Sequence, residues 1–230
     1  MSPRISVLAV LLSLAAPLAG FAAESTPAAS STTSSAASLG PALSSAFGLL
    51  LDSATTADRT TLGLPDTLAK IQAAAKVAGK SALADQLAAK LNTSSESSFT
   101  PALDLVKSAL SDVPWSDAKN LAAGGNTAVT DFIRKSTATK LRAQLLPTVQ
   151  KAVAAAGVSD QYKQLLSAAG PAASLFGKPG VSDLEGFVAD KTLESVYAYL
   201  AKQETALRAD PSLAQNPLVK QAFALLAPKK

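Results

Sequence analysis

Two pairs of polar residues have spacings that could do chemistry. Ser116 and Lys119 lie three positions apart, so a helix would place them on one face, where a desolvated lysine can activate a serine nucleophile. The Ser-Asp-Asn and Lys-Thr-Gly elements that accompany this motif in penicillin-binding enzymes are absent from the chain. The alternative interpretation, a serine at a helix start beside a solvated lysine, is therefore favoured.

Asp190 and Glu194 form the second pair, one helical turn apart, and such carboxylates can hold a hard cation or act as general acid and base. Lys191 beside them favours the alternative of a solvated helix face. Because the chain contains no histidine and no cysteine, carboxylates are the last resort for acid–base catalysis if the protein is an enzyme. A Ser-His-Asp triad, a cysteine nucleophile and an ordinary zinc site are excluded, and no metal or other cofactor is expected.

A third group of residues is basic. Arg134, Lys135 and Arg142 fall within a wedge of about 100° on a helix that turns by about 100° per residue. Such a wedge can bind an anionic head group or an acidic partner, although an ordinary solvated face has the same pattern. Elsewhere the charge is spread along the chain without a block of like sign. Nucleic acid is not expected as a partner, because its recognition needs a concentrated basic stripe.

The elements that must position these residues are predicted to be helices. Apolar residues make up 48% of the chain of 230 residues and charged residues 17%, a balance typical of globular proteins. Alanine and leucine dominate the apolar part and aromatic residues amount to 5%, which favours helices over strands. The predicted fold class is all-α, a single compact multi-helix domain.

Helix boundaries are predicted from capping signals. Thr93-Ser94-Ser95-Glu96 and Ser182-Asp183-Leu184-Glu185 have the form of capping boxes, which bind free amides at helix starts. Asn126 and Asn216 are predicted N-caps, and Pro147 is expected to kink or divide a long helix. The predicted core consists of apolar residues at helical spacing: Leu43, Phe47, Leu50, Leu51, Leu68, Ile71, Ala75, Leu83, Leu87, Leu91, Phe99, Leu103, Val106, Leu110, Val129, Ile133, Leu141, Leu145, Val149, Val153, Phe187, Val188, Val196, Tyr197, Leu200, Val219, Phe223 and Leu226.

Residues 1–23 are predicted to be a secretory signal peptide. Arg4 precedes an uncharged run up to Ala23, Pro17 breaks that run, and the small residues around Ala22 offer a cleavage site. The alternative is a membrane anchor, since nineteen uncharged residues approach a spanning length, but Pro17 and the small residues favour cleavage. Phe21 stands where a lipoprotein cleavage box needs cysteine, which excludes thioether lipidation. A periplasmic or secreted location follows, with no membrane span once the leader is removed.

Residues 24–38 are predicted to be a flexible tether. Thirteen of these fifteen residues are serine, threonine or alanine, which cannot offset the entropy lost on ordering. The helical domain is predicted over residues 39–230. Because the chain has no cysteine, no disulfide stabilises an exported domain, and its stability must come from a core.

Three segments together resemble one known family. Residues 91–96 are similar to a Met-Asn-Arg-Ala-Ala-Glu segment, residues 130–137 to a Thr-x-Tyr-Phe-Arg-x-x-Thr stretch, and residues 64–66 to the start of Leu-Pro-x-x-Leu. The family with these segments is a bacterial exported one, catalogued as domain of unknown function 4197. The resemblance runs from about Leu39 to the C-terminus and implies an all-helical exported domain, without implying an activity. Departures from the pattern are Leu91 for Met, Thr93-Ser94-Ser95 for Arg-Ala-Ala, and Phe132-Ile133 for Tyr-Phe.

Four polar residues within these segments are the candidate site: Asn92, Glu96, Arg134 and Thr137. Their helical neighbours are largely apolar, and an unpaired charge in such surroundings costs about 3–5 kcal/mol. We therefore expect Glu96 and Arg134 to form a salt bridge, with Asn92 or Thr137 completing the network. One interpretation is that the network locks two helices together. The other is that Arg134 stays accessible at the base of a groove and binds an anionic group in bidentate fashion.

The sequence favours a non-catalytic envelope protein that binds an envelope partner, or an apolar or anionic, lipid-like ligand, through a helical groove. The alternative is a hydrolase that uses carboxylates or a Ser–Lys pair. The two functions need different surfaces. A binding protein needs a contiguous apolar patch or groove, whereas an enzyme needs a cleft into which polar groups converge.

Overall fold

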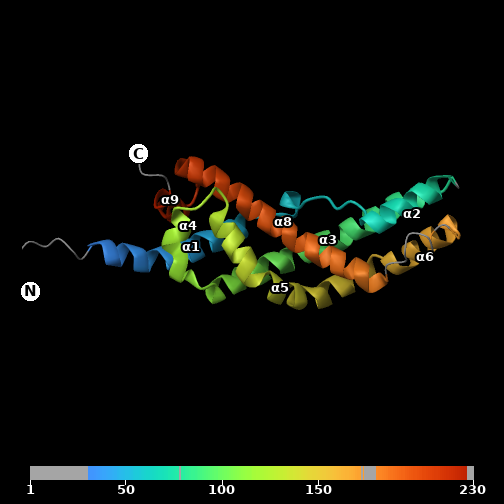
Figure 1. Cartoon of the computed structure of the whole chain (residues 1–230), viewed down its shortest axis with the longest axis horizontal. Coiled ribbons are helices and arrows are strands. Elements are labelled where there is room, and N and C mark those ends of the chain that lie inside the picture. The colour runs from blue at the N-terminus through green and yellow to red at the C-terminus, as the bar shows by residue number, and fades with distance from the viewer. Residues whose placement is uncertain (1–30, 78, 172, 174–179, 227–230) are drawn as a thin grey trace, which may run out of the picture.

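The computed structural model describes residues 31–77, 79–171, 173 and 180–226, and the structural statements below concern these residues. Every regular element in them is helical and no strand occurs, which confirms the predicted all-α class. Three long helices form the middle of the molecule and pack against one another: α3 (Ala82–Ala109), α5 (Ala128–Ala155) and α8 (Val181–Ala209). Figure 1 shows them side by side along the long axis.

Shorter helices cover the two ends of this central layer (Figure 1). At one end α1 (Ser31–Ser53) packs against α9 (Pro217–Ala224) and against the five-residue α4 (Ala118–Ala122). At the other end α2 (Asp66–Val77) packs against α6 (Val158–Ala169). Four short 3-10 turns complete the described elements: η1 (Thr56–Asp58), η2 (Leu110–Asp112), η3 (Trp115–Asp117) and η4 (Pro211–Leu213).

One continuous cluster of buried apolar side chains extends through the α-helices at both ends and in the middle. Of the twenty-eight residues that the sequence analysis named as core, twenty-six belong to it, whereas Leu83 and Phe187 are partly buried and pack against it. The described helices include no segment that combines the length and apolar character needed to cross a membrane. The helical spacing of leucine, valine and phenylalanine was therefore sufficient to identify the buried faces.

The N-terminal predictions fall mostly outside the described residues. Residues 1–23, the predicted leader, and residues 24–30 of the predicted tether are among those not described. Helix α1 begins at Ser31 and so extends into the segment assigned to the tether. Adding residues to an existing helix needs no new nucleus, and alanine has the highest helix propensity. Leu39, where the domain was predicted to start, is the first residue of α1 whose side chain is described, and it is buried.

The predicted capping box at residues 93–96 is wrong, because this segment lies inside the continuous helix α3. Its hydroxyls do not bind free amides at a helix start. Thr93 and Ser94 donate back to carbonyls one turn earlier, those of Ala89 at 3.1 Å and Lys90 at 2.9 Å, and the Ser95 hydroxyl lies 2.9 Å from that of Thr192 on α8. Serine and threonine can satisfy their hydroxyls in this way within a helix, so the pattern of residue types is ambiguous.

Two other helix starts differ from the prediction. Helix α8 begins with Gly180 as its N-cap rather than Ser182, and the carboxylate of Asp183 accepts the Gly180 amide at 2.5 Å. Helix α5 begins after Thr127 rather than Asn126, and Thr127 makes no side-chain cap. Pro147 lies inside α5 without dividing it. Asn216 is confirmed as the N-cap of α9, since its side chain accepts the Leu218 amide at 2.9 Å.

The start of α5 is capped from another helix. Glu204 of α8 accepts the Val129 amide at 3.0 Å, and it accepts the Thr130 amide and hydroxyl at 2.8 and 2.7 Å. Arg208 donates to Glu204 at 2.9 Å and to the last carbonyls of α4, those of Leu121 at 2.8 Å and Ala122 at 3.1 Å. The Glu204 and Arg208 side chains are 0% and 6% exposed. This Glu204–Arg208 clamp joins the end of α4 and the start of α5 to α8.

The other end of α5 is also completed by a distant residue. Gly157 follows the helix with φ 66°, a left-handed conformation that glycine adopts without steric cost. Lys90 of α3 donates its ammonium to the Ala156 carbonyl at 2.7 Å. Helix α5 thus has a carboxylate at its N-terminus and an ammonium at its C-terminus, the arrangement that the helix dipole favours.

Candidate functional site

The structure separates the four predicted site residues into two places. Glu96 pairs with Arg59 at 3.6 Å and not with Arg134, so the predicted Glu96–Arg134 salt bridge is wrong. Asn92 and Glu96 face the segment between α1 and α2, which crosses α3, whereas Thr137 and Arg134 face α8. Arg59 lies in an irregular segment, where no periodic pattern marks a partner for Glu96.

Asn92 uses its whole amide to hold this crossing segment. Its oxygen accepts the Leu62 amide at 2.8 Å and the Arg59 guanidinium at 3.1 Å. Its nitrogen donates to the carbonyls of Leu62 at 2.9 Å and Ala88 at 2.9 Å. A side chain with all these bonds has no capacity left for a ligand. The structure therefore favours the locking role for Asn92, although the two parts it joins are a helix and a loop.

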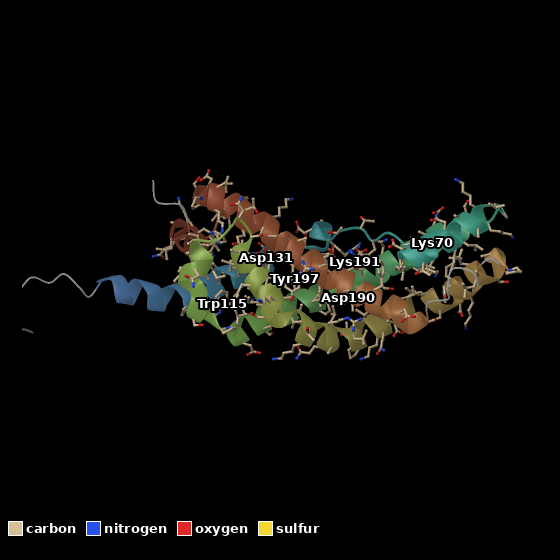
Figure 2. The ribbon with its side chains drawn as sticks, viewed as in Figure 1. Lys70, Trp115, Asp131, Asp190, Lys191 and Tyr197 are labelled. Carbon is tan, nitrogen blue, oxygen red and sulfur yellow. The ribbon has the colours of Figure 1, made fainter. Side chains whose placement is uncertain are left out.

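Thr137 and Arg134 lie where α5 packs against α8, and Arg134 lines a pocket together with Tyr197 and Asp190. Figure 2 labels Tyr197 and Asp190 on α8. The Thr137 hydroxyl lies 3.0 Å from the Tyr197 hydroxyl and donates to the Ile133 carbonyl at 2.7 Å. Burial raises the pKa of Tyr197 above its ordinary value, and the bond to Thr137 and the charge of Arg134 oppose this rise. Tyr197 is therefore a neutral phenol at neutral pH.

A pocket of about 270 Å³ opens beside these residues, and we call it the α5–α8 pocket. The predicted acidic pair lines it, but each carboxylate has its own cation. Asp190 accepts from the Arg142 guanidinium at 2.6 Å, and Glu194 accepts from Lys191 at 2.8 Å. Within the described residues no group of three or more acidic side chains could hold a metal ion. The side chain of Lys119 is not described, so the Ser116–Lys119 pairing stays a prediction.

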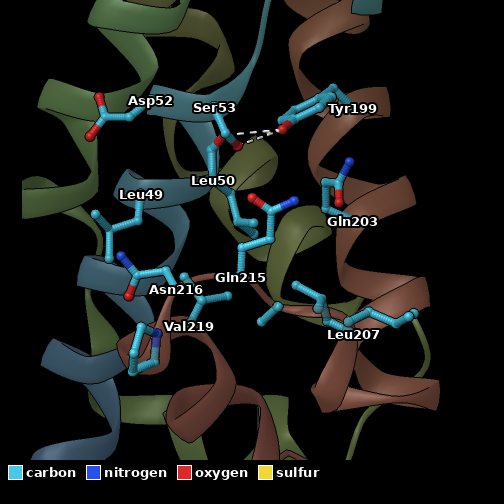
Figure 3. Close-up of a pocket in the computed structure, with 13 residues that line it drawn as sticks. Leu49, Leu50, Asp52, Ser53, Tyr199, Gln203, Leu207, Gln215, Asn216 and Val219 are labelled. Atoms are coloured by element: carbon cyan, nitrogen blue, oxygen red, sulfur yellow. Dashed lines mark hydrogen bonds between the residues drawn. The ribbon is translucent and has the colours of Figure 1, made fainter.

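A large hollow in the described structure is one that the sequence did not indicate. It has a volume of about 710 Å³, lies between α1, α8 and the segment from η4 to α9, and is drawn in Figure 3. Pockets for small molecules typically have volumes of about 300–1,000 Å³. We call this hollow the α1–α8–α9 groove. Its lining residues are Leu49, Leu50, Asp52, Ser53, Tyr199, Gln203, Leu207, Leu213, Ala214, Gln215, Asn216, Pro217 and Val219.

One part of the groove presents uncharged hydrogen-bonding groups. The hydroxyls of Ser53 and Tyr199 lie 2.9 Å apart and share the carbonyl of Leu50, at 2.7 and 3.1 Å. Figure 3 shows the amides of Gln203 and Gln215 turned toward the same part of the hollow. Neither amide has a hydrogen-bond partner among the described residues. The groove therefore offers free donors and acceptors beside an apolar wall.

Charge contributes little to this groove. Asp52 is the one charged residue among those that line it, and its carboxylate pairs with Lys107 of α3. The apolar wall comes from leucines of α1, α8 and η4 and from Val219 of α9. These residues are far apart in the sequence, and glutamine or serine alone gives no motif. That these residues line one groove could be found only from the structure, in which α9 packs against α1.

The family model described as Protein of unknown function (DUF4197) matches residues 41–224 of the chain. The chain belongs to this family. The match confirms the resemblance carried by residues 64–66, 91–96 and 130–137, and it extends from the first buried turns of α1 to the last residue of α9. Both hollows are therefore built from the DUF4197 region. Comparison with curated proteins and with solved structures gives no match.

Proposed function

We propose that this DUF4197 protein is an exported, non-catalytic binding protein that holds an amphipathic ligand in the α1–α8–α9 groove. The observation that carries the proposal is the hollow of about 710 Å³ in which unpartnered amides lie beside an apolar wall. A binding site for a small molecule combines a mostly apolar surface with a few polar groups that fix the ligand's orientation. The groove combines both kinds of surface in similar proportion, so polar groups contribute more to it than to such a pocket.

The polar groups favour an uncharged head on the ligand. Gln203 and Gln215 each provide both a donor and an acceptor, which suits hydroxyl, ester or amide groups. A charged head would lose hydration without gaining an opposite charge, because Asp52 is already paired with Lys107. Leucines and Val219 provide the surface for an aliphatic or cyclic body. The ligand class is therefore a neutral amphiphile.

The alternative function, a hydrolase, has less support. Asp190 and Glu194 each form an ion pair, so neither carboxylate is poised as a free base. Within the groove, the partners of Ser53 are the Tyr199 hydroxyl and a peptide carbonyl, and neither is a carboxylate, imidazole or amine that could serve as its general base. Nothing there activates the serine.

Export rests on the leader-like segment, residues 1–23. We expect the exported protein to begin at Ala23 or Glu24, because the small residues before these positions suit signal peptidase. Intact mass spectrometry of the protein from the exported fraction measures this. A Leu11→Arg variant is the control, since a charge in the apolar run should retain the full chain inside the cell. An exported wild-type protein that keeps Met1 would contradict the proposal.

Binding in the groove is tested with monocaprylin, a neutral amphiphile, by isothermal titration calorimetry. Gln215→Leu is expected to weaken its affinity about tenfold, because the ligand's polar head loses a hydrogen-bond partner. Gln221→Leu is the matched control: Gln221 is exposed on α9 and does not line the groove, so the affinity should not change.

Two results would contradict the groove proposal. Failure of monocaprylin to bind the wild-type protein would remove the neutral amphiphile as its ligand class. Caprylate has the same chain with a carboxylate head, and we expect it to bind more weakly in the groove. Equal affinities for the two compounds, both lowered by Gln215→Leu, would show that an uncharged head is not what the groove selects.

A further inference from the structure

We propose a second binding site, independent of the groove, in which Arg134 binds the carboxylate of a small monoanionic ligand in the α5–α8 pocket. The structure describes four arginines. Arg59 pairs with Glu96, Arg142 with Asp190 and Arg208 with Glu204. Arg134 has no ion pair or hydrogen bond within the described residues, and it lines a concave pocket.

The pocket is formed by two facing rows of residues. Arg134, Ala138 and Arg142 follow one another at one-turn intervals on α5, and the row on α8 runs from Asp190 to Tyr197. Ala138 is the small residue of its row, between two long arginine side chains, and leaves room there. The Arg142–Asp190 ion pair lies at one end of the rows, and the Thr137–Tyr197 hydrogen bond lies near Arg134 at the other.

Charge balance in the pocket selects the kind of anion. The lining contains two arginines and two carboxylates. Arg142 is neutralised by Asp190, and Glu194 is neutralised by Lys191, so the one charge left without a partner is that of Arg134. A monoanion balances this single charge. A dianion would exceed it and would also be repelled by the two nearby carboxylates.

Geometry favours a planar carboxylate with a small apolar body. A guanidinium binds a carboxylate through two parallel hydrogen bonds, which adds orientation to the charge attraction. Ala138, Leu193 and the Tyr197 ring provide apolar surface around Arg134. The volume of about 270 Å³ is suited to a compact ligand such as a short-chain or aromatic acid.

Benzoate is the probe, and its affinity is measured by calorimetry or by chemical-shift titration with the full mature protein. Arg134→Gln is expected to weaken benzoate binding at least about tenfold, because a charge-assisted bidentate contact is lost. Arg134→Lys should be intermediate, since it keeps the charge and loses the fork geometry. The control is Lys135→Gln, which removes the same charge from the adjacent exposed position outside the pocket.

The control and competitors decide the outcome. Lys135→Gln and Gln215→Leu should leave benzoate affinity unchanged, and all variants should keep the wild-type unfolding midpoint. Equal losses of benzoate affinity in Arg134→Gln and Lys135→Gln would show that the affinity depends only on the net positive charge of this surface. That result would overturn the proposed site. Sulfate, a dianion, should bind more weakly than benzoate. Sulfate binding of equal or greater strength, lost in Arg134→Gln, would overturn the selection for a monoanionic carboxylate.

Discussion

Replacement of Glu204 by alanine is expected to lower the free energy of unfolding by about 3–5 kcal/mol, the range found when one partner of a buried ion pair is removed. The Glu204 side chain is fully buried and accepts bonds from Val129, Thr130 and Arg208. Its loss leaves the Arg208 guanidinium without a counter-ion and two α5 amides without acceptors. Urea unfolding followed by circular dichroism measures the change.

A surface pair provides the control for this prediction. Glu194 forms an ion pair of similar length with Lys191, but both side chains are about half exposed, at 50% and 44%. Exposed pairs contribute about 0–1 kcal/mol, so Glu194→Gln should change the unfolding free energy by no more than this. A loss in Glu204→Ala as small as that in Glu194→Gln would show that the clamp does not hold α5. Joint replacement by Glu204→Gln and Arg208→Met should cost less than Glu204→Ala alone, because no unpaired charge stays buried.

Replacement of Phe223 by alanine is the second change with a large expected effect, a loss of about 3–5 kcal/mol in unfolding free energy. Phe223 is fully buried, and its ring stacks on Phe47 of α1 with the centroids 5.8 Å apart. Helix α9 has eight residues, too few for an isolated helix to be stable in water. Its position therefore depends on the stripe that it buries against α1, and Phe223 is the largest member of that stripe.

The neighbouring Leu225 gives a matched test, because it is 51% exposed and lies two positions further along the chain. Leu225→Ala should change the unfolding free energy by no more than about 0.5 kcal/mol. Phe223→Ala should also abolish monocaprylin binding below the temperature of global unfolding, since Val219 and Pro217 of α9 form one wall of the groove. Retention of full binding in Phe223→Ala would show that α9 stays docked without the Phe47 contact.

Local patterns were sufficient to predict much of this fold. The helical spacing of Leu68 and Ile71 marks the buried face of α2, and Asn216 before Pro217 marks the start of α9. In these cases the residues that carry the sequence pattern lie within a few positions of the residues that form the buried face or the helix start. The family resemblance likewise rested on short segments, and the family match over residues 41–224 confirms it.

The predictions failed where the deciding partner is distant in sequence. Residues 93–96 were interpreted as a helix start because serine can cap a helix or bond back within one, and neighbouring packing determines which occurs. Glu96 was paired with Arg134 because both are charged residues in apolar helices, whereas its partner, Arg59, lies in an irregular segment. The groove gave no sequence signal, since Ser53 and Tyr199 are 146 positions apart.

The capping of α5 by other helices has a consequence for the order in which the chain folds during synthesis. Glu204 leaves the ribosome 75 residues after Val129, the amide that it must accept. Until then the amides at the start of α5 have no carboxylate to bind, and α5 has no side-chain cap of its own. The central layer therefore cannot be completed while α8 is still being made. Under the export proposed above, a translocation channel takes up unfolded chain, and this dependence on a late residue delays completion of the central layer.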